Sequence, residues 1–240
     1  MTKYNYDEIR PGYYDAIYHK NCGVQSRWHH HKFETLARFI PNRGRHLDIG
    51  CGPGTFIGSL ASSHNLQSIG IDFSQGQIDY ASSKYKSDKA YFECIDLFDP
   101  SFNKKVGGEF DIITFVEVIE HIEKEEAIKM LSVARKKLSK NGKILITSPN
   151  YHSGWGVLEK IVNKLGEVTY EDQHVNKYTH KTLGYDLRES GFQSISVSSF
   201  LSVSPFIASF NWGLSKKVAR QELYAGPFRP LGFLLIAEAF

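Results

Sequence analysis

The densest group of residues able to do chemistry is an E-x-x-E-H pattern formed by Glu117, Glu120 and His121. It overlaps the end of an apolar stretch, residues 111–118, that has the composition of a strand buried on both faces. Carboxylate and imidazole groups in such a cluster suit two roles. They can hold magnesium, manganese or zinc, or one of them can take a proton from a hydroxyl group. The residues alone leave both roles open, together with the simpler alternative that they only hydrogen-bond within a loop.

A second candidate site is the glycine-rich sequence LDIGCGPGTF, residues 47–56. Gly50, Gly52 and Gly54 allow a sharp turn after a strand and let a ligand approach the backbone. The pattern differs from the dinucleotide-binding fingerprint, because Thr55 occupies the position of the third glycine. We therefore expect a ligand without a pyrophosphate, and not a nicotinamide dinucleotide.

Two further acids are expected at neighbouring strand ends. Asp72 closes a predicted strand 69–72, and Asp96 follows a predicted strand 91–95. A sugar diol offers two hydroxyl donors, and a carboxylate can accept both. Because open α/β sheets bind ligands at the carboxyl ends of parallel strands, these acids and the glycine loop should share one edge. A role in capping a turn stays open for either acid, and Asp99 competes with Asp96.

The elements that must position these residues alternate between strand and helix along the middle of the chain. The pattern predicts an α/β fold, a doubly wound, mostly parallel, Rossmann-like sheet of about seven strands. Two late strands are expected to pair antiparallel, so the last strand is antiparallel, with helices on both faces. The predicted strands are 45–49, 69–72, 91–95, 111–118, 143–147, 194–203 and 232–240.

The predicted helices have recognisable ends. Ser74 and Gln77 match a capping box at the start of one helix. In a later helix glutamates crowd the first turn and lysines up to Lys140 crowd the last, and Asn141–Gly142 is expected to end it. Further helices are expected over 55–63, 154–165 and 182–190.

Composition and charge exclude some classes of function. The 240 residues carry a formal net charge of +3 without a long basic block, so binding to nucleic acid is not expected. Cys22, Cys51 and Cys94 lie far apart without a CxxC pair, as thiols do in a reducing, cytoplasmic compartment. Neither an apolar leader nor an apolar run of membrane-spanning length is visible, so export and a membrane span are not expected.

The DIGCGPG loop and the acids at the following strand ends resemble the class I S-adenosylmethionine-dependent methyltransferases over about residues 45–191. The resemblance implies S-adenosylmethionine as the cofactor. It implies that the glycine loop lies under the methionine part, that the acid after the second strand binds the ribose hydroxyls, and that the acid after the third meets the adenine. The implied cofactor-binding residues are Asp48, Gly50, Gly52, Gly54, Asp72, Phe73, Asp96, Leu97 and Glu117.

The EVIEH sequence resembles the metal-binding motif of the terminal-ribose 2′-O-methyltransferases of small RNAs, and a motif of ubiquinone-pathway O-methyltransferases. In the small-RNA enzymes a further histidine, from a loop beyond the fifth strand, completes the site, and His174 is the matching residue here. The resemblance thus implies a divalent-cation site made by Glu117, Glu120, His121 and His174. Without a cation, His121 or His174 would take the acceptor proton, and Glu117 is the third candidate catalytic residue.

The three parts of the chain are expected to have different tasks within one domain, residues 1–240. Residues 1–44 are rich in aromatic side chains and should form two helices that act as a lid, or that only pack on the core. Residues 45–150 are the expected cofactor-binding half and 151–240 the substrate-side half. The run His29–His31 points to different sides of a helix and is not a metal site by itself.

The Glu- and His-rich mouth of the sheet favours an oxygen nucleophile, because a hydroxyl needs deprotonation near attack and a neutral amine does not. We expect O-methylation of a small molecule or of a saccharide- or lipid-linked acceptor, since the segment after residue 147 resembles methyltransferases of polysaccharide, glycolipid and quinone pathways. The alternatives are a metal-dependent RNA ribose 2′-O-methyltransferase and a catalytically silent, cofactor-binding partner subunit. The sequence leaves the oligomeric state open.

Aromatic side chains suit the wall of a site for a cationic methyl donor. The candidates are Tyr14, Tyr18, Trp28, Tyr151, Trp155 and Tyr178. The aromatic segment 204–214, followed by Lys216, Lys217 and Arg220, is expected either to contact a membrane surface or to cap the substrate pocket.

Overall fold

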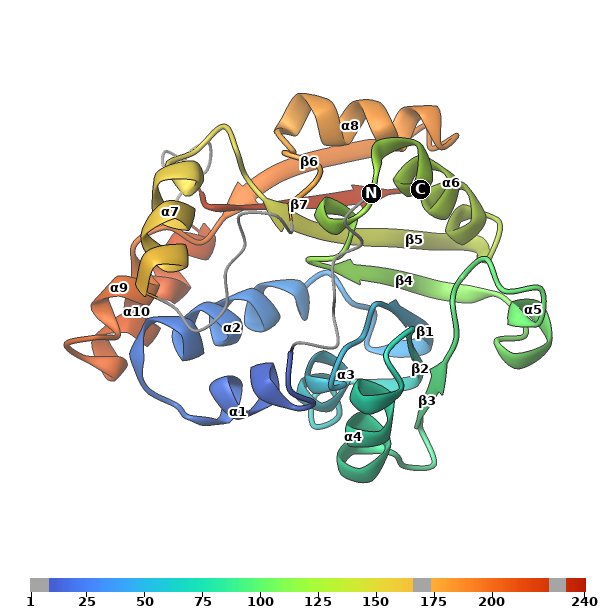
Figure 1. The fold of residues 1–240 in the computed structure, drawn as a ribbon, viewed down its shortest axis with the longest axis horizontal. Helices are drawn as coiled ribbons and strands as arrows, with labels where there is room; N and C mark the ends of the chain where they lie inside the picture. Colours follow the sequence, from blue (N-terminus) through green and yellow to red (C-terminus); the bar gives the residue numbers. More distant parts are fainter. Residues whose placement is uncertain (1–8, 166–173, 225–231) are drawn as a thin grey trace.

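The computed structural model describes residues 9–165, 174–224 and 232–240, and these form a seven-stranded sheet with helices on both faces (Figure 1). The strand order is β3-β2-β1-β4-β5-β7-β6. Strands β1 to β5 pair in parallel, and β7 is antiparallel to both of its neighbours. The predicted fold class, including the antiparallel last strand, is confirmed. The strands are β1 Arg43–Ile49, β2 Asn65–Asp72, β3 Ala90–Cys94, β4 Phe110–Val116, β5 Leu138–Pro149, β6 Ile195–Phe200 and β7 Leu234–Ala239.

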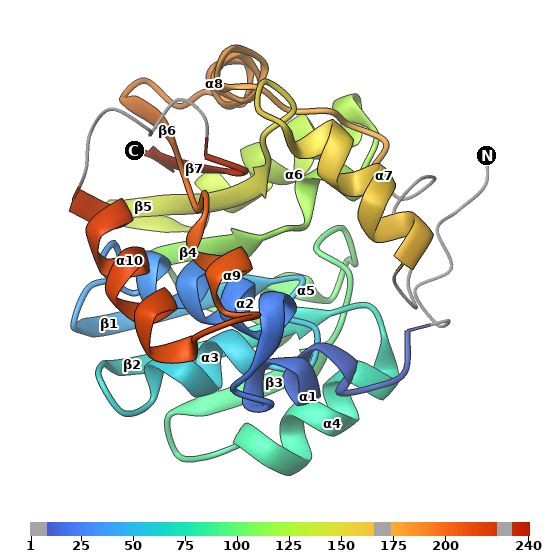
Figure 2. The same ribbon diagram turned by 90° about the vertical axis from the view of Figure 1, so that its left-hand side faces the viewer.

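The helices cover the sheet in two layers because alternate residues of the central strands are apolar on both faces. Ile113 packs in the cluster that holds α6 and α8, and Ile112 packs in the cluster that holds α2 and α3. Figure 2 shows these two layers above and below the strands. The helices are α1 Tyr13–His19, α2 Gly23–Leu36, α3 Thr55–Leu60, α4 Gln75–Tyr85, α5 Phe102–Lys105, a 3₁₀ turn Ile119–His121, α6 Lys124–Arg135, α7 Trp155–Leu165, α8 His180–Glu189, α9 Ser204–Ile207 and α10 Trp212–Tyr224. Among the described residues, no helix combines the length and the apolar character needed to cross a membrane.

One predicted cap and two predicted helix ends are wrong. The predicted capping box does not form, because Gln77 instead accepts a hydrogen bond from the Gly12 backbone and donates one to the Ile9 carbonyl. Helix α6 ends at Arg135, and Asn141–Gly142 lies within β5, where the register with β4 shifts. Helix α3 ends at Leu60, three residues early.

Other predicted features hold. Two helices precede β1, a helix covers residues 180–189 where one over 182–190 is predicted, and β6 and β7 form an antiparallel pair. The aromatic segment 204–214, for which the sequence predicts no particular element, contains α9 and the start of α10. Residues 166–178 carry no strand or helix signal in the sequence, and those of them that the structure describes, 174–178, form neither. All three cysteines are free thiols.

The order of the strands fixes where a site can form. Strand β1 pairs with β2 on one side and with β4 on the other, so the connections diverge from the carboxyl ends of β1 and β4. Such a switch point opens a crevice for ligands in open α/β sheets. The glycine loop follows β1, and the E-x-x-E-H residues follow β4.

Candidate active site

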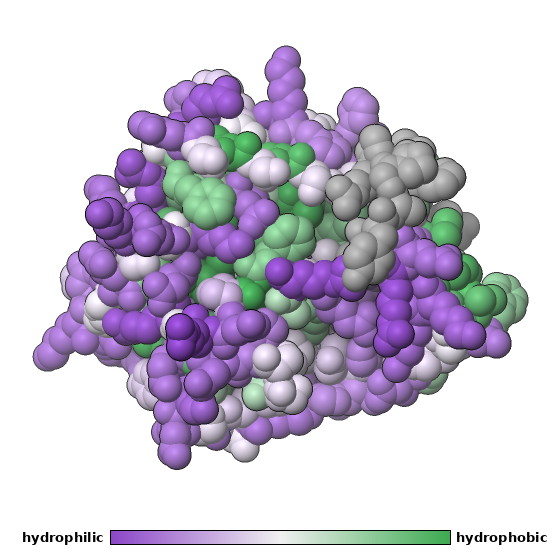
Figure 3. All heavy atoms as spheres, turned by 180° about the vertical axis from the view of Figure 1, so that it is seen from behind, coloured by the Kyte–Doolittle hydropathy of each residue, from purple (hydrophilic) through white to green (hydrophobic). Residues whose placement is uncertain are grey.

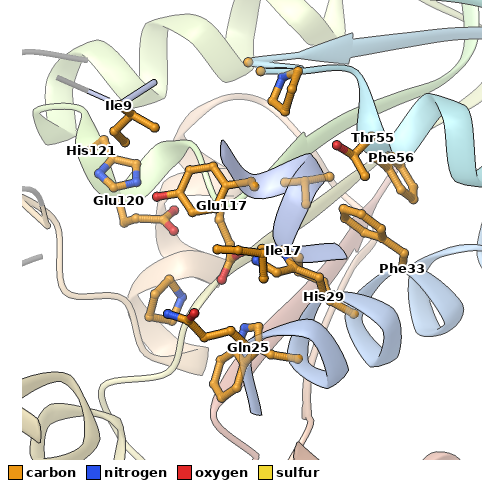
Figure 4. Close-up of a pocket in the computed structure, with 18 of the residues that line it drawn as sticks. Ile9, Ile17, Gln25, His29, Phe33, Thr55, Phe56, Glu117, Glu120 and His121 are labelled. Carbon is orange, nitrogen blue, oxygen red and sulfur yellow. The ribbon is translucent and has the colours of Figure 1, made fainter. Parts of the chain in front are cut away.

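The described residues enclose a pocket between the carboxyl ends of β1, β4 and β5 and the N-terminal helices α1 and α2. Figure 4 shows Glu117, Glu120 and His121 on one side of it and Phe33, Thr55 and Phe56 on the other. The lining includes these predicted site residues: Asp48, Gly50, Gly52, Glu117, Glu120, His121 and His174. The topology thus brings together residues up to 126 positions apart, from Asp48 to His174.

The glycine loop is shaped by close packing. Gly50 has φ +71°, and a Cβ atom there would lie 2.6 Å from Val118 Cγ2, so only glycine fits. The Asp72 carboxylate accepts hydrogen bonds from the backbone N–H groups of Gly52, at 2.9 Å, and of Ser74, at 2.9 Å. Burial raises the pKa of Asp72, and these two donors partly offset the effect. Asp72 therefore braces the loop from the end of β2.

Asp48 lies in the floor of the pocket, where it is 1% exposed. Thr114 Oγ1 donates to its carboxylate at 2.6 Å, and His46 Nε2 lies 2.8 Å from the same hydroxyl. Burial raises the pKa of Asp48 to about 7, against the effect of the Thr114 hydrogen bond. The pocket floor thus holds a carboxyl group that a nearby positive charge would ionise.

The other predicted cofactor residues lie outside this pocket lining. Asp72 and Asp96 follow neighbouring strands, and the Ile95 amide bonds the Asp72 carbonyl at 3.0 Å. Phe73 is 62% exposed, whereas Leu97 is buried in the core. Both Asp96 and its competitor Asp99 accept a backbone N–H two residues ahead, so the structure does not separate them.

Gly54 also lies outside the pocket lining, and close packing leaves no room for a side chain at this position. It has φ +74°, and a Cβ atom there would lie 2.8 Å from the Phe92 ring. Its place is at the start of α3, where the helix approaches β3.

The side of the pocket near the ends of β4 and β5 contains three possible ligand atoms in one group. One atom each from Glu120, His121 and His174 lie within 4.8 Å of one another. Glu120 is fully buried, and neither of its carboxylate oxygens makes a well-formed hydrogen bond, although the Ser148 hydroxyl lies close enough to lower its pKa slightly against the effect of burial. Burial, and next the charge of Glu117, raise the pKa of Glu120 well above its usual value. Glu117, the fourth predicted ligand, is not a member of this group.

Glu159 and Tyr151 fix the orientation of the His174 ring through contacts with its Nδ1 atom. Its Nδ1 atom lies 2.5 Å from Glu159 Oε1 and 2.8 Å from the Tyr151 hydroxyl, and Tyr151 also donates to Glu159 at 2.8 Å. Because Nδ1 makes these contacts, the other ring nitrogen, Nε2, points away from Glu159. Burial lowers the pKa of His174, and Glu159 opposes the shift, so the imidazole is neutral near pH 7.

The N-terminal helices are tied to the glycine loop by a buried acid. Asp15 of α1 is fully buried and accepts from the Thr55 hydroxyl at 2.9 Å and from the Tyr80 hydroxyl at 2.9 Å. Lys84 and Tyr85 of α4 also donate to it. Although burial opposes the effect, these donors hold the pKa of Asp15 below its usual value. Thr55, which replaces the third glycine of the dinucleotide fingerprint, therefore anchors α1 over the pocket.

A buried ion pair crosses the pocket. Lys32 of α2 donates to the Glu117 carboxylate at the end of β4. Glu117 has φ +56°, an uncommon backbone conformation for a residue other than glycine. The pair joins α2 to the carboxyl end of β4.

The aromatic candidates divide into two groups. Tyr14, Trp28 and Trp155 line the pocket. The other three lie outside the lining: Tyr18 stacks on His30, Tyr151 holds His174, and Tyr178 is buried in the core.

The three histidines of α2 separate as predicted. His29 lines the pocket, His30 stacks on Tyr18, and His31 hydrogen-bonds the Ser204 hydroxyl at 2.8 Å.

Three residues of the site are missing from the sequence-based prediction. Asp15, Lys32 and Glu159 each act on a partner that lies at least 15 positions away. A single acid in the tyrosine-rich segment 13–18 was the one visible signal for Asp15. Lys32 and Glu159 resemble ordinary polar residues of amphipathic helices.

Comparisons with known proteins agree with this geometry. A family model described as a methyltransferase domain matches residues 24–197, well over half of the chain. A sphingolipid C9-methyltransferase of Candida albicans is 29% identical over 119 residues, which are 47% of this chain and 23% of that protein. A ubiquinone biosynthesis O-methyltransferase of Coxiella burnetii is 29% identical over 122 residues, 50% of each chain. The matches thus span half or less of the length of these relatives.

Solved structures show the same fold. A methyltransferase from Archaeoglobus fulgidus has a TM-score of 0.60 at 20% identity, with 86% of this chain and 91% of that chain covered. Magnesium protoporphyrin IX methyltransferase from Synechocystis, solved with bound S-adenosylhomocysteine, has a TM-score of 0.61 at 19% identity, with 94% and 91% covered. The chain belongs to the methyltransferase-domain family and has the fold of the S-adenosylmethionine-dependent methyltransferases.

Proposed function

We propose that this enzyme methylates a hydroxyl group of a small molecule or of a saccharide- or lipid-linked acceptor, with a divalent cation held by Glu120, His121 and His174. The observation that carries the proposal is the grouping of the fully buried Glu120 carboxylate, which makes no well-formed hydrogen bond, with one ligand atom each of His121 and His174. Buried polar groups are nearly always paired, so a carboxylate with only a weak contact to Ser148 at the wall of a pocket has room for a further partner. Two imidazole rings beside it make a cation the best fit to the donor set.

A cation at this place would lower the pKa of the acceptor hydroxyl. The protein residues have separate tasks. Glu120 supplies the negative charge, and His121 and His174 supply neutral nitrogen donors. Glu159 and Tyr151 fix the orientation of His174, as groups behind metal-ligating histidines commonly do. If the site works without a cation, a neutral His174 is still able to accept the hydroxyl proton.

The proposal also assigns residues to each part of the cofactor. Asp72 would accept the ribose hydroxyls, Asp48 and the glycine loop would lie beside the sulfonium, and Asp96 with Leu97 and Phe73 would meet the adenine. S-adenosylmethionine supplies the methyl group. Helices α1 and α2 would exclude water, which favours a reaction in which the charge on sulfur disappears. Residues 1–44 are the proposed lid, 45–150 the cofactor-binding half and 151–240 the substrate-side half of one domain.

The remaining wall of the pocket is apolar. Trp28, Trp155, Leu158 and Phe206 line it beside the proposed cation site. This supports an acceptor with an apolar or aromatic body near its hydroxyl. The described lining contains Lys32 as its one lysine or arginine, and that residue is paired, which speaks against an RNA backbone.

Two further observations favour a lipid-linked acceptor. Two relatives are named for a sphingolipid and for ubiquinone biosynthesis. Val203, Phe210 and Leu214 are 50% or more exposed around α9 and α10, and Phe210 is 93% exposed. In Figure 3, hydrophobic side chains gather at the right-hand edge over these helices, beside hydrophilic ones. We propose a cytoplasmic enzyme that contacts a membrane surface through this edge.

The test uses tritiated S-adenosylmethionine and matched acceptors with the same aromatic body that carry either a hydroxyl or an amine. We expect transfer to the hydroxyl compounds, loss of transfer after exhaustive chelation, and recovery when magnesium, manganese or zinc is added. Turnover that survives chelation would contradict the proposed role of a cation. A preference for the amines would overturn O-methylation, and tight binding without any turnover on a broad acceptor panel would favour a silent partner subunit.

A further inference from the structure

Asn176 makes two hydrogen bonds to one short turn of the candidate active site. Its backbone N–H group donates to the Glu120 carbonyl at 2.9 Å, and its side-chain Nδ2 donates to the Ile122 carbonyl at 2.5 Å, 54 positions away in the chain. These two carbonyls lie on either side of His121 in the sequence. The 3₁₀ turn Ile119–His121 is so short that its last carbonyls need partners from outside the helix. Asn176 supplies these partners.

The segment that contains Asn176 also contains His174. From residue 174 to 178 its side chains alternate between buried or half-buried and exposed, which is the pattern of an extended chain. Tyr178 is buried, its hydroxyl lies 3.5 Å from Asn176 Nδ2, and its carbonyl accepts from the Tyr151 backbone N–H at 2.9 Å. The bonds of Asn176 thus tie the segment of one histidine to the turn of the other.

The two histidine rings are fixed in different ways. Glu159 and Tyr151 set the direction of the His174 ring through its Nδ1 atom. Asn176 instead sets where the backbone beside His174 lies relative to the turn, and the rings of His121 and His174 are 5.1 Å apart between centroids. Ligands from two distant parts of a chain can serve one cation only where the structure fixes those parts to within about 0.5 Å.

We propose that Asn176 is a positioning residue for the cation site. By bonding the backbone on both sides of His121, it holds His174 where Glu120, His121 and His174 offer three atoms within 4.8 Å of one another. The inference rests on the cation in the proposed function, and it names the residue that assembles the site from two parts of the chain. Removal of a group that orients metal ligands typically lowers metal affinity by about 10- to 100-fold.

The experiment removes the side-chain bond and keeps the backbone bond. Asn176→Leu preserves most of the side-chain volume without a donor, and Asn176→Ala is the second variant in case leucine does not fit. Electron paramagnetic resonance should show manganese binding weakened by about 10- to 100-fold in each variant that folds. Calorimetry should show S-adenosylhomocysteine binding within about threefold of wild type, because Asp72 braces the glycine loop independently of this segment.

A matched control lies on the same segment. Val175 is 45% exposed, so Val175→Ala should change neither the manganese affinity nor the S-adenosylhomocysteine affinity. The comparison of two ligands separates positioning from stability, because a bond that only stabilised the fold would affect both ligands alike.

Unchanged manganese affinity in both Asn176 variants would overturn the inference and leave the proposed cation in place. An equal loss of manganese and S-adenosylhomocysteine would also overturn it, because Asn176 would then have a general structural role. A wild-type protein that methylates hydroxyl acceptors but binds no manganese, magnesium or zinc would overturn the proposed cation, and this inference with it.

Discussion

The buried acids are bonded differently in two parts of the site. The proposed cofactor half consists of β1 to β3 with the glycine loop, and the proposed acceptor half consists of the ends of β4 and β5 with α7 and His174. In the cofactor half, Asp72 accepts two backbone N–H groups and Asp48 accepts the Thr114 hydroxyl. In the acceptor half, the Glu120 carboxylate is fully buried and makes no well-formed hydrogen bond. The acids of the first half are thus bonded within the protein, whereas Glu120 is free to accept a further partner.

The two halves differ in how far they are arranged before a ligand binds. A loop braced by its own backbone can bind a cofactor with little rearrangement. Burial raises the pKa of Glu120, and a cation at this place would favour its ionised form.

The sharpest test of the contrast is Glu120→Gln. With the negative charge gone, we expect methyl transfer to fall by about 1,000-fold, because loss of a Lewis acid removes several kcal/mol of transition-state stabilisation. Binding of manganese, followed by electron paramagnetic resonance, should be lost as well. The exposed Glu123→Gln is the matched control. A variant that keeps its rate and its manganese would show that Glu120 has only a structural role.

Asp48 provides a pH test of the cofactor half. Its pKa of about 7 in the folded state lies above the value in the unfolded chain, so the proton stabilises the fold at low pH and this contribution is lost as the pH rises to 7. Relative to Asp48→Asn, the ligand-free wild type should lose on the order of 3 kcal/mol of unfolding free energy between about pH 4 and 7. Urea denaturation across this range measures the difference. Parallel curves for the two proteins would exclude a raised pKa at Asp48.

Asp72→Ala should weaken S-adenosylhomocysteine by about 1–3 kcal/mol, since it removes the acceptor for the ribose hydroxyls. The variant also removes the brace on Gly52, so the loop should become easier to cleave by protease. Calorimetry beside the exposed Asp79→Ala gives the comparison. Equal affinity for Asp72→Ala and wild type would remove Asp72 from the cofactor site.

The smallest effect concerns the membrane edge. Phe210→Ser should lower binding to vesicles of mixed anionic and neutral lipid by about tenfold, because it exposes no core and removes one apolar anchor. Transfer to a water-soluble acceptor should not change. The matched control is Tyr185→Ser, an exposed aromatic on α8. Equal sedimentation of all three proteins with vesicles would contradict a membrane contact at α9 and α10.

The sequence predicts the cofactor half better than the acceptor half for a physical reason. The glycine loop, Asp72 and the apolar β4 are specified by neighbours in the chain, through backbone conformation and burial on both faces. The group of Glu120, His121 and His174 was predicted through a resemblance, and the structure brings these three together. It pairs Glu117 with Lys32 instead.

What the sequence did not predict depends on tertiary contacts. The capping box at Ser74 does not form, because the Gln77 side chain hydrogen-bonds to the backbone groups of Gly12 and Ile9 instead. The hydrogen-bond partners of Asp15 and Glu159 can be identified only when α1 and α7 are placed beside the sheet. Residues that join the N-terminal helices to the site therefore have no local sequence pattern that would identify them.

The most direct test of the contrast between the two halves is anomalous diffraction at the manganese edge, from crystals grown with S-adenosylhomocysteine and manganese. The account predicts an anomalous peak within coordination distance of Glu120, His121 and His174, in the same crystal in which Asp72 contacts the ribose. A bound nucleoside with no peak there, and with Glu120 hydrogen-bonded only to protein groups, would contradict it.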